Sequence, residues 1–200
     1  MTLSNQSDKK IDIYGYQVPK KSQVICGDRY FWIDTKDYFL CVLSDGLGSG
    51  EAAYMASSAV IREIEQSHDE DVQTLMEKCN KALKSTRGAA VAIIKVYYKS
   101  REFVYSCVGN LNFYLFYPSD KLIYPLPVMG YLSGKPQRFN TQRYSYVPNS
   151  KFLFHSDGVE PRSIKSLLRT SMSLDELVVR VRQNEHLRTD DFTFIAGFLS

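Results

Sequence analysis

The stretch FLCVLSDG at residues 39–46 is an unbroken apolar run that ends in a carboxylate, Asp45, and a glycine, Gly46. An apolar run without alternation is typical of a strand that is buried on both faces. A polar turn at residues 35–37 joins it to another apolar run at residues 30–34, so the two runs predict a β-hairpin. A Gly-rich turn follows, and the small and apolar residues after it predict a helix over residues 51–65.

The rest of the chain predicts an α+β fold, because its strands and helices come in groups and do not alternate. Besides the hairpin and the helix, we expect strands at residues 11–18, 89–98, 102–108, 113–117, 121–124, 142–147, 151–155 and 192–199, and helices at residues 71–84, 163–169 and 173–184. Asp69 or Asp71 can cap the first of these helices, and residues 173–176 form a capping box at the start of the last. Two antiparallel sheets packed together, with helices outside, would satisfy this order.

Length and composition predict one domain over residues 1–200, of which residues 1–10 are expected to be frayed. The net charge is only +3 and the basic residues are scattered, which argues against a nucleic-acid surface. No segment approaches the roughly 20 apolar residues that a membrane-spanning helix needs, so no membrane partner is expected. The four cysteines are far apart in the sequence, which suits buried thiols in a reducing compartment and predicts a cytoplasmic protein.

The Ser-Asp-Gly ending of residues 39–46 recurs once, where an apolar run at residues 152–155 leads into Asp157 and Gly158. A single Asp-Gly pair is usually a turn. A hairpin turn should be followed at once by a returning strand, yet a predicted helix follows Asp45, and a loop and a helix follow Asp157. The repeated ending therefore indicates more than two turns.

Further acidic residues lie beside predicted strands, namely Asp28 before the run at residue 30, and Asp190 with Asp191 before the last strand. Buried carboxylates placed together repel one another unless a cation neutralises them. Mg²⁺ and Mn²⁺ take oxygen ligands such as carboxylates and backbone carbonyls. The spacing thus favours a metal site at Asp45 and Asp157, and the glycine after Asp45 would let its own carbonyl face the metal.

Two other kinds of site have less support in the sequence. The glycines at residues 46, 48 and 50 lie between a strand and a helix, but Glu51 occupies the position of the third glycine of a dinucleotide fingerprint, and no Walker motif is present. A nucleophilic triad is also disfavoured. His155, Ser156 and Asp157 are contiguous, whereas triad members must face one another across a site, and no G-x-S-x-G elbow occurs.

Taken together, these stretches resemble the metal-dependent protein phosphatases of the type-2C superfamily, and within it the bacterial SpoIIE-like branch. The resemblance is carried by CGD at residues 26–28, SDGLGSG at 44–50, RGAA at 87–90, VGN at 108–110, HSDG at 155–158 and DDFT at 190–193. These stretches appear in the family's order and span nearly the whole chain.

The resemblance implies a four-layer αββα sandwich and two Mn²⁺ or Mg²⁺ ions. It implies that Asp45 bridges the two ions and that Gly46 contributes its carbonyl. Asp157 and Asp190 would complete the ligand set of one metal ion, and Asp28 would act near the other through water. Catalysis would then run through the bound metals and a bridging hydroxide.

Some positions depart from the family's pattern, and others are candidates for holding the metal ligands in place. Asn110 stands where many relatives carry an acid, so a third metal is not expected. Asn110 and Asp191 are candidates for holding the metal ligands in place. The phosphate-binding Arg near the N-terminus of the eukaryotic enzymes has no clear counterpart, so the metals would carry most phosphate recognition.

The resemblance implies hydrolysis of phosphoserine or phosphothreonine on a partner protein. The small size and the stretch YPLPVMGYLSGKP at residues 124–136 are similar to those of members that act in the stressosome circuit. This implies phosphorylated RsbS and RsbR as substrates, negative feedback on the general-stress sigma factor, sigma-B, and a monomeric enzyme.

Alternatives remain open at this point. The chain could be a phosphoprotein-binding module of the same fold without catalysis, or a phosphatase of another anti-sigma antagonist. Residues 128–139, rich in Gly, Pro and basic residues, could form a docking loop or a plain connection.

Overall fold

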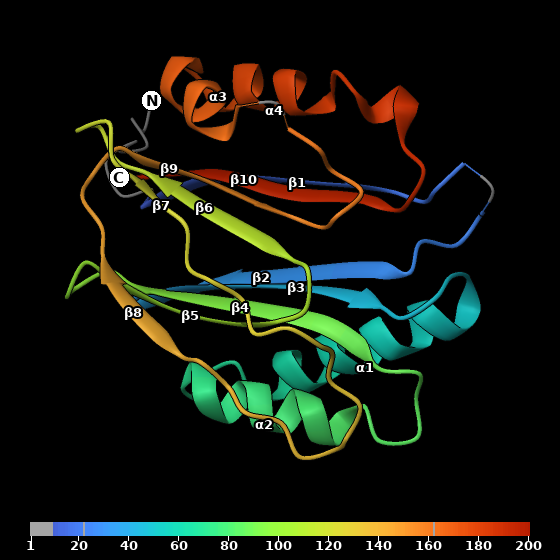
Figure 1. Ribbon diagram of the computed structural model, residues 1–200. Coiled ribbons are helices and arrows are strands. Elements are labelled where there is room, and N and C mark those ends of the chain that lie inside the picture. The colour runs from blue at the N-terminus through green and yellow to red at the C-terminus, as the bar shows by residue number, and fades with distance from the viewer. Residues whose placement is uncertain (1–9, 22, 162) are drawn as a thin grey trace, which may run out of the picture.

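The computed structural model describes residues 10–21, 23–161 and 163–200, in which two five-stranded antiparallel sheets pack face to face (Figure 1). One sheet has the order β1 (Ile11–Val18), β10 (Phe192–Leu199), β9 (Ser150–His155), β6 (Asn112–Phe116) and β7 (Leu122–Ile123). The other has the order β2 (Asp28–Asp34), β3 (Tyr38–Gly46), β4 (Ala89–Tyr97), β5 (Glu102–Val108) and β8 (Gln142–Ser145).

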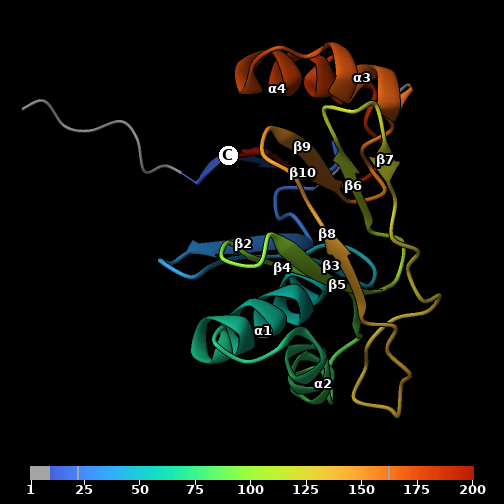
Figure 2. The same cartoon turned by 90° about the vertical axis from the view of Figure 1, so that its left-hand side faces the viewer.

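Helices cover the outer faces of both sheets, as the two views at right angles show (Figures 1 and 2). The helices α1 (Glu51–Ser67) and α2 (Val72–Ala82) lie on the β2–β3–β4–β5–β8 sheet. On the other sheet lie α3 (Ile164–Thr170) and α4 (Leu174–Arg182), followed by the short 3₁₀ turn η1 (Glu185–Leu187). The expected α+β class and four-layer αββα sandwich are confirmed.

The core is divided into three apolar layers, one between the sheets and one under each pair of helices. β3 contributes to two of them, since Phe39 and Leu43 face the opposite sheet while Leu40 and Val42 face the α1 and α2 side. Successive side chains of a strand point to opposite faces, so a strand between two apolar layers must be apolar throughout. This is why the run at residues 39–43 shows no alternation.

The helix starts follow their capping residues. Of the two candidates before α2, Asp71 is the cap, because its Oδ1 accepts a hydrogen bond from the Thr74 N–H at 3.0 Å. At α4 the Ser173 hydroxyl accepts from the Glu176 N–H at 3.1 Å. The Glu176 carboxylate accepts in return from the Met172 N–H, one residue before the position expected for a capping box.

A few element ends differ from the prediction. The strand expected at residues 121–124 is reduced to Leu122–Ile123, and β8 ends at Ser145, although the Tyr146 N–H still donates to the Arg101 carbonyl at 2.8 Å. The last helix ends at Arg182. The expected fraying of residues 1–10 lies outside the described residues except at Lys10, whose Nζ donates to the Lys36 carbonyl.

All four cysteines are free thiols, and three of them are buried, as their apolar surroundings predicted. Burial raises the pKa of Cys26, the remaining half-buried thiol, to about 12, so it is protonated at neutral pH. Among the described residues, no helix is long and apolar enough to cross a membrane.

Candidate metal centre

Two of the predicted carboxylates face each other across the β2–β3 ladder, because the register pairs Asp28 directly with Asp45. Like charges at directly opposed positions of a sheet are destabilising. Asp28 is only 1% exposed, and its Oδ2 has no hydrogen-bond partner among the described residues. The ionised form of the buried Asp28 carboxylate is therefore left without a compensating group among the described residues.

The opposite sheet supplies two more carboxylates from a pair of neighbouring strands. Asp157 comes two residues after β9 ends, and Asp190 comes two residues before β10 begins. Because β9 and β10 are adjacent and antiparallel, these two positions meet at the same end of the sheet. Both residues line one cavity of about 690 Å³, together with Gly158.

The charges of the other three acids act on Asp45. Burial raises its pKa, and the negative charges of Asp28, Asp157 and Asp190 raise it further. Burial also raises the pKa of Asp157, with Asp190 as the next cause. Four acids from both sheets therefore gather at one end of the sandwich, where the other three make ionisation of Asp45 more costly.

Burial is the main cause of the raised pKa of Asp28, and the charges of Asp191 and Asp157 act in the same direction. The hydroxyls of Thr193 and Ser156 act in the opposite direction. They do not supply the missing partner, since the Thr193 hydroxyl and Asp28 Oδ2 are both buried without a hydrogen bond among the described residues. A cation or an ordered water is the ordinary partner for such an orphaned pair.

Asp191 has a different place from its neighbour Asp190. Its carboxylate accepts hydrogen bonds from the Gly27 N–H at 2.6 Å and the Lys20 N–H at 2.8 Å. Its own N–H donates to Asp190 Oδ1 at 2.8 Å. Asp191 thereby ties the connection between β1 and β2 to the start of β10 and fixes the backbone immediately before Asp28.

Asn110 lies beside the cavity carboxylates. It follows β5, and its Nδ2 donates to Asp157 Oδ2 at 2.6 Å. An amide at this position orients the carboxylate without adding negative charge. A carboxylate in the same place would have repelled Asp157 unless a further cation neutralised both.

The glycines of the two Ser-Asp-Gly endings are required by close packing. A Cβ at Gly46 would lie 1.9 Å from the Ala53 carbonyl oxygen in the first turn of α1, and a Cβ at Gly158 would lie 1.9 Å from the Asp191 carbonyl oxygen. Each glycine thus lets a neighbouring backbone segment approach the strand end that carries the carboxylate. Because α1 rests directly on Gly46, it sets the position of Asp45.

The donor set fits a hard divalent cation. Among the described residues, no three His, Cys, Asp or Glu side chains are already gathered around one point as ligands. Asp28, Asp157 and Asp190 nevertheless lie near enough to Asp45 to raise its pKa, and the oxygen-only set of these four residues is the kind that Mg²⁺ and Mn²⁺ prefer. His155 is unsuited to the set, since burial lowers its pKa to about 4 and its Nδ1 contacts the Ser156 carbonyl.

One cavity residue, Arg188, was missed by the sequence analysis. Its Nε donates to the Pro19 carbonyl at 2.9 Å and its Nη1 to the Glu185 carbonyl at 3.3 Å, so the guanidinium is held in the wall of the cavity that Asp157 and Asp190 line. The only sequence signal is its position two residues before Asp190, because Pro19, which accepts the Nε hydrogen bond, is distant in sequence.

The chain is similar to known proteins in both sequence and fold. The family described as Stage II sporulation protein E (SpoIIE) matches residues 35–197. The chain is 39% identical over 195 residues to the phosphoserine phosphatase RsbX of Bacillus subtilis (strain 168), which covers 98% of both chains. A crystal structure of RsbX in complex with magnesium is similar with a TM-score of 0.92 and 40% identity, covering 95% of this chain and 96% of that one.

Two further structures are more distant. A structure from work on the bacterial stressosome, a modular system adapted to control secondary messenger signaling, matches with a TM-score of 0.84 and 25% identity over 94% of this chain and 100% of that one. The catalytic domain of the phosphatase PstP in complex with two manganese ions matches with a TM-score of 0.75 and 14% identity, over 94% of this chain and 98% of that one, which shows the shared fold alone.

Proposed function

The chain belongs to the SpoIIE family of type-2C metal-dependent phosphatases, and on that premise we propose that it removes phosphate from phosphoserine or phosphothreonine of partner proteins at the carboxylate cluster. The observation that carries the proposal is the meeting of four acids from both sheets beside one cavity, with a buried carboxylate oxygen that has no hydrogen-bond partner among the described residues. A phosphate monoester is itself anionic, so it can approach such a cluster only when cations are bound there.

The proposed ligands are those that the family resemblance implies, and the gathering of the four acids supports them. Asp45 would be the ligand shared by two ions, since both Asp28 on its own sheet and the Asp157–Asp190 pair of the other sheet are close to it. Gly46 would add its carbonyl, Asp157 and Asp190 would hold one ion, and Asp28 would act on the other through water. When bound, the two Mn²⁺ or Mg²⁺ ions supply hydroxide at neutral pH and neutralise charge on the phosphoryl group.

The other residues of the site would position the substrate and the ligands. The Asn110 amide holds the Asp157 carboxylate in one orientation, and Asp191 holds the backbone before Asp28. The Arg188 guanidinium uses Nε and Nη1 on backbone carbonyls, which leaves Nη2 to face an anionic group in the cavity. Arg188 is therefore our candidate for binding the phosphoryl group or a neighbouring acidic side chain of the substrate.

We infer that phosphorylated stressosome proteins of the RsbS and RsbR type are the substrates and that the enzyme acts as a monomer. The inference is supported by the 39% identity with RsbX over nearly the whole chain and by the similarity to a stressosome structure. In that role it would provide negative feedback on sigma-B. A phosphatase of another anti-sigma antagonist is the second candidate, while the retained carboxylates speak against a binding module without catalysis.

The test is the release of phosphate from phosphorylated RsbS, with phosphorylated RsbR and an anti-sigma antagonist phosphoprotein in parallel. We expect release that needs Mn²⁺ or Mg²⁺ and stops with EDTA, with RsbS or RsbR turned over faster than the antagonist. Faster turnover of the antagonist phosphoprotein would indicate that the enzyme acts in another regulatory circuit. An inert protein on all three substrates in the presence of Mn²⁺ would contradict the proposed catalysis.

A further inference from the structure

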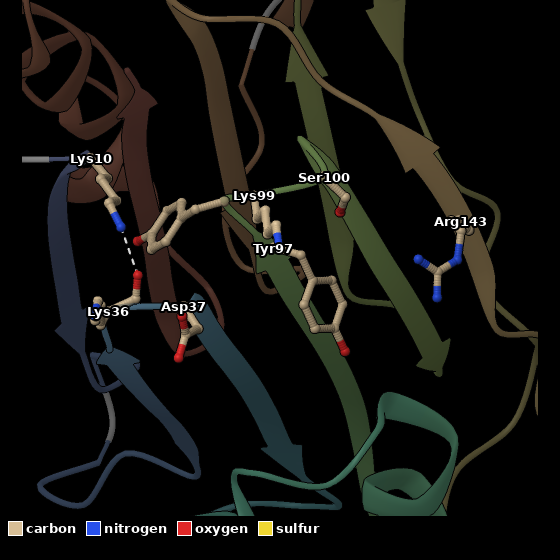
Figure 3. A pocket seen from close by; sticks show the side chains of 8 residues that line it. Lys10, Lys36, Asp37, Tyr97, Lys99, Ser100 and Arg143 are labelled. Atoms are coloured by element: carbon tan, nitrogen blue, oxygen red, sulfur yellow. Dashed lines mark hydrogen bonds between the residues drawn. The ribbon is translucent and has the colours of Figure 1, made fainter.

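A second cavity lies at the end of the sandwich opposite to the carboxylates, and it has a volume of about 900 Å³ (Figure 3). It is formed by the start of β1, the β2–β3 turn, the β4–β5 turn and β8. Asp37 in its wall and Asp45 in the metal centre are eight residues apart along β3, a separation of about 26 Å at roughly 3.3 Å per residue. A ligand in this cavity would not touch the catalytic groups.

The lining of this cavity is mainly cationic. It contains Lys10, Lys36, Lys99 and Arg143, against the single carboxylate of Asp37. Among the described residues, neither Lys36 nor Lys99 makes an ion pair, and both side chains are exposed at turns.

The other two cations are held in place. The Lys10 Nζ donates to the Lys36 carbonyl at 2.6 Å and lies 4.6 Å from the centroid of the Tyr98 ring. Arg143 pairs with Glu102 at 3.0 Å. The remaining nearby acid, Asp34, accepts a hydrogen bond from the Tyr98 hydroxyl. A positive excess remains after these pairings, and it is displayed on two turns that project toward the cavity.

The cations stand on both sides of an aromatic floor. Figure 3 shows Lys10 and Lys36 on one side of Tyr97, and Arg143 on the other. A single small anion could reach the cations of one side only. An extended peptide with carboxylates at both ends and an apolar side chain between them could contact both sides and the tyrosine rings together.

We propose that this cavity binds an extended, acidic peptide segment of a protein partner. The carboxylates of the segment face Lys36 and Lys99, and its backbone N–H groups meet the Asp37 carboxylate and the Ser100 hydroxyl. A DNA backbone or a polyphosphate fits less well, because its phosphate linkages carry no N–H or O–H donors for the Asp37 carboxylate. The proposal does not depend on which phosphoprotein is dephosphorylated at the other end.

The experiment measures binding of a fluorescein-labelled peptide in which Glu alternates with Tyr and Gly, using fluorescence anisotropy. The double variant Lys36→Glu/Lys99→Glu reverses both unpaired charges, and the double variant Arg62→Glu/Lys81→Glu makes the same change in net charge on exposed faces of α1 and α2. The second variant is therefore the matched control for bulk charge. A peptide with Gln in place of Glu controls for the carboxylates.

We expect the wild type and the Arg62→Glu/Lys81→Glu control to bind the Glu peptide alike, and the Lys36→Glu/Lys99→Glu variant to bind it at least about tenfold more weakly, since like charges would replace complementary ones. Hydrolysis of p-nitrophenyl phosphate should be unchanged in both variants, which shows that the fold and the catalytic end are intact. Equal losses in the two variants, equal binding of the Gln peptide, or displacement of the peptide by oligothymidylate at lower concentration than by unlabelled peptide would each overturn the proposal.

Discussion

The two ends of the β-sandwich carry opposite charges, although one hairpin, β2–β3, contributes to both. At one end it supplies Asp28 and Asp45, and at the other it supplies Lys36 and Asp37. Asp28 is buried, so water cannot screen its charge, whereas Lys36 and Asp37 are exposed. Charges in the interior interact strongly and call for a bound counter-ion, while exposed charges are screened within roughly 10 Å at ordinary salt.

This difference separates chemistry from recognition. Buried carboxylates that raise one another's pKa make a place for cations, and exposed lysines on turns make a surface that selects partners. The overall charge of +3 hides both features, because it averages over two ends of opposite sign.

The largest effect expected from this comparison is at Asp45. The change Asp45→Asn removes the carboxylate that both sheets share, and should lower kcat/KM on p-nitrophenyl phosphate by more than the roughly 10–100-fold that loss of an outer partner of a metal ligand costs. Asp37→Asn, the same chemical change at the other end of β3, should leave activity unchanged. Comparable activity in the two variants would abolish the distinction between the ends.

The stability of the metal-free protein should depend on pH because of the carboxylates at the buried end. The pKa of Asp28 and of Asp45 is raised, so above the ordinary Asp pKa of about 3.9 the folded state holds protons that the unfolded chain has lost. Unfolding then releases protons, so stability falls as pH rises. With EDTA we expect a lower melting temperature near pH 8 than near pH 6, and Mn²⁺ should remove most of the difference.

Asp28→Asn is the control for that measurement. It deletes one member of the cluster, so the metal-free variant should lose less stability between the two pH values. A variant with the same pH dependence as the wild type would show that other groups cause it.

A smaller effect is expected at Asn110, which orients Asp157 through the 2.6 Å hydrogen bond. Asn110→Ala should raise the Mn²⁺ concentration needed for half-maximal activity by about 10–100-fold, as for other groups that orient a metal ligand. Titration of activity with Mn²⁺ measures this. Asn140→Ala, at an exposed loop position, should give the wild-type curve, and an unchanged Asn110→Ala curve would remove Asn110 from the site.

Arg188 tests substrate binding at the same cavity. Arg188→Ala should raise KM for a phosphopeptide by about tenfold or more, the loss expected for a charged hydrogen bond of roughly 1.5–3 kcal/mol, with a smaller effect on kcat. Arg188→Lys should recover part of the affinity, because the charge remains. Arg182→Ala removes a nearby guanidinium that pairs with Glu185, and should leave KM unchanged.

The smallest effect should come from the exposed end. Arg143 and Glu102 form an ion pair with both side chains partly in solvent, so Arg143→Ala should change the free energy of unfolding by less than about 1 kcal/mol. Urea denaturation measures the change. A larger loss would indicate that this end, too, depends on its charges for stability.

Much of the fold was predictable because burial leaves a local pattern. The first and last strands have the predicted bounds, and the unbroken run at residues 39–43 correctly indicated a strand between two apolar layers. The short strand β7 was overestimated, since a pattern of apolar residues cannot show that its pairing with β6 is limited to two residues on each strand. The choice of Asp71 over Asp69 as a cap also depended on backbone geometry that both residues could have adopted.

Strand burial and turn chemistry are local properties. The sequence by itself therefore determined where the buried strands β3 and β9 end, and that an aspartate stands at each of these two ends. Only the tertiary structure decided that Asp28 stands opposite Asp45, and that Arg188 reaches the cavity lined by Asp157 and Asp190. It also decided that lysines from separate turns surround a second cavity. The physical reason is that strand register and sheet order are set by contacts between segments distant in sequence, which no local pattern records.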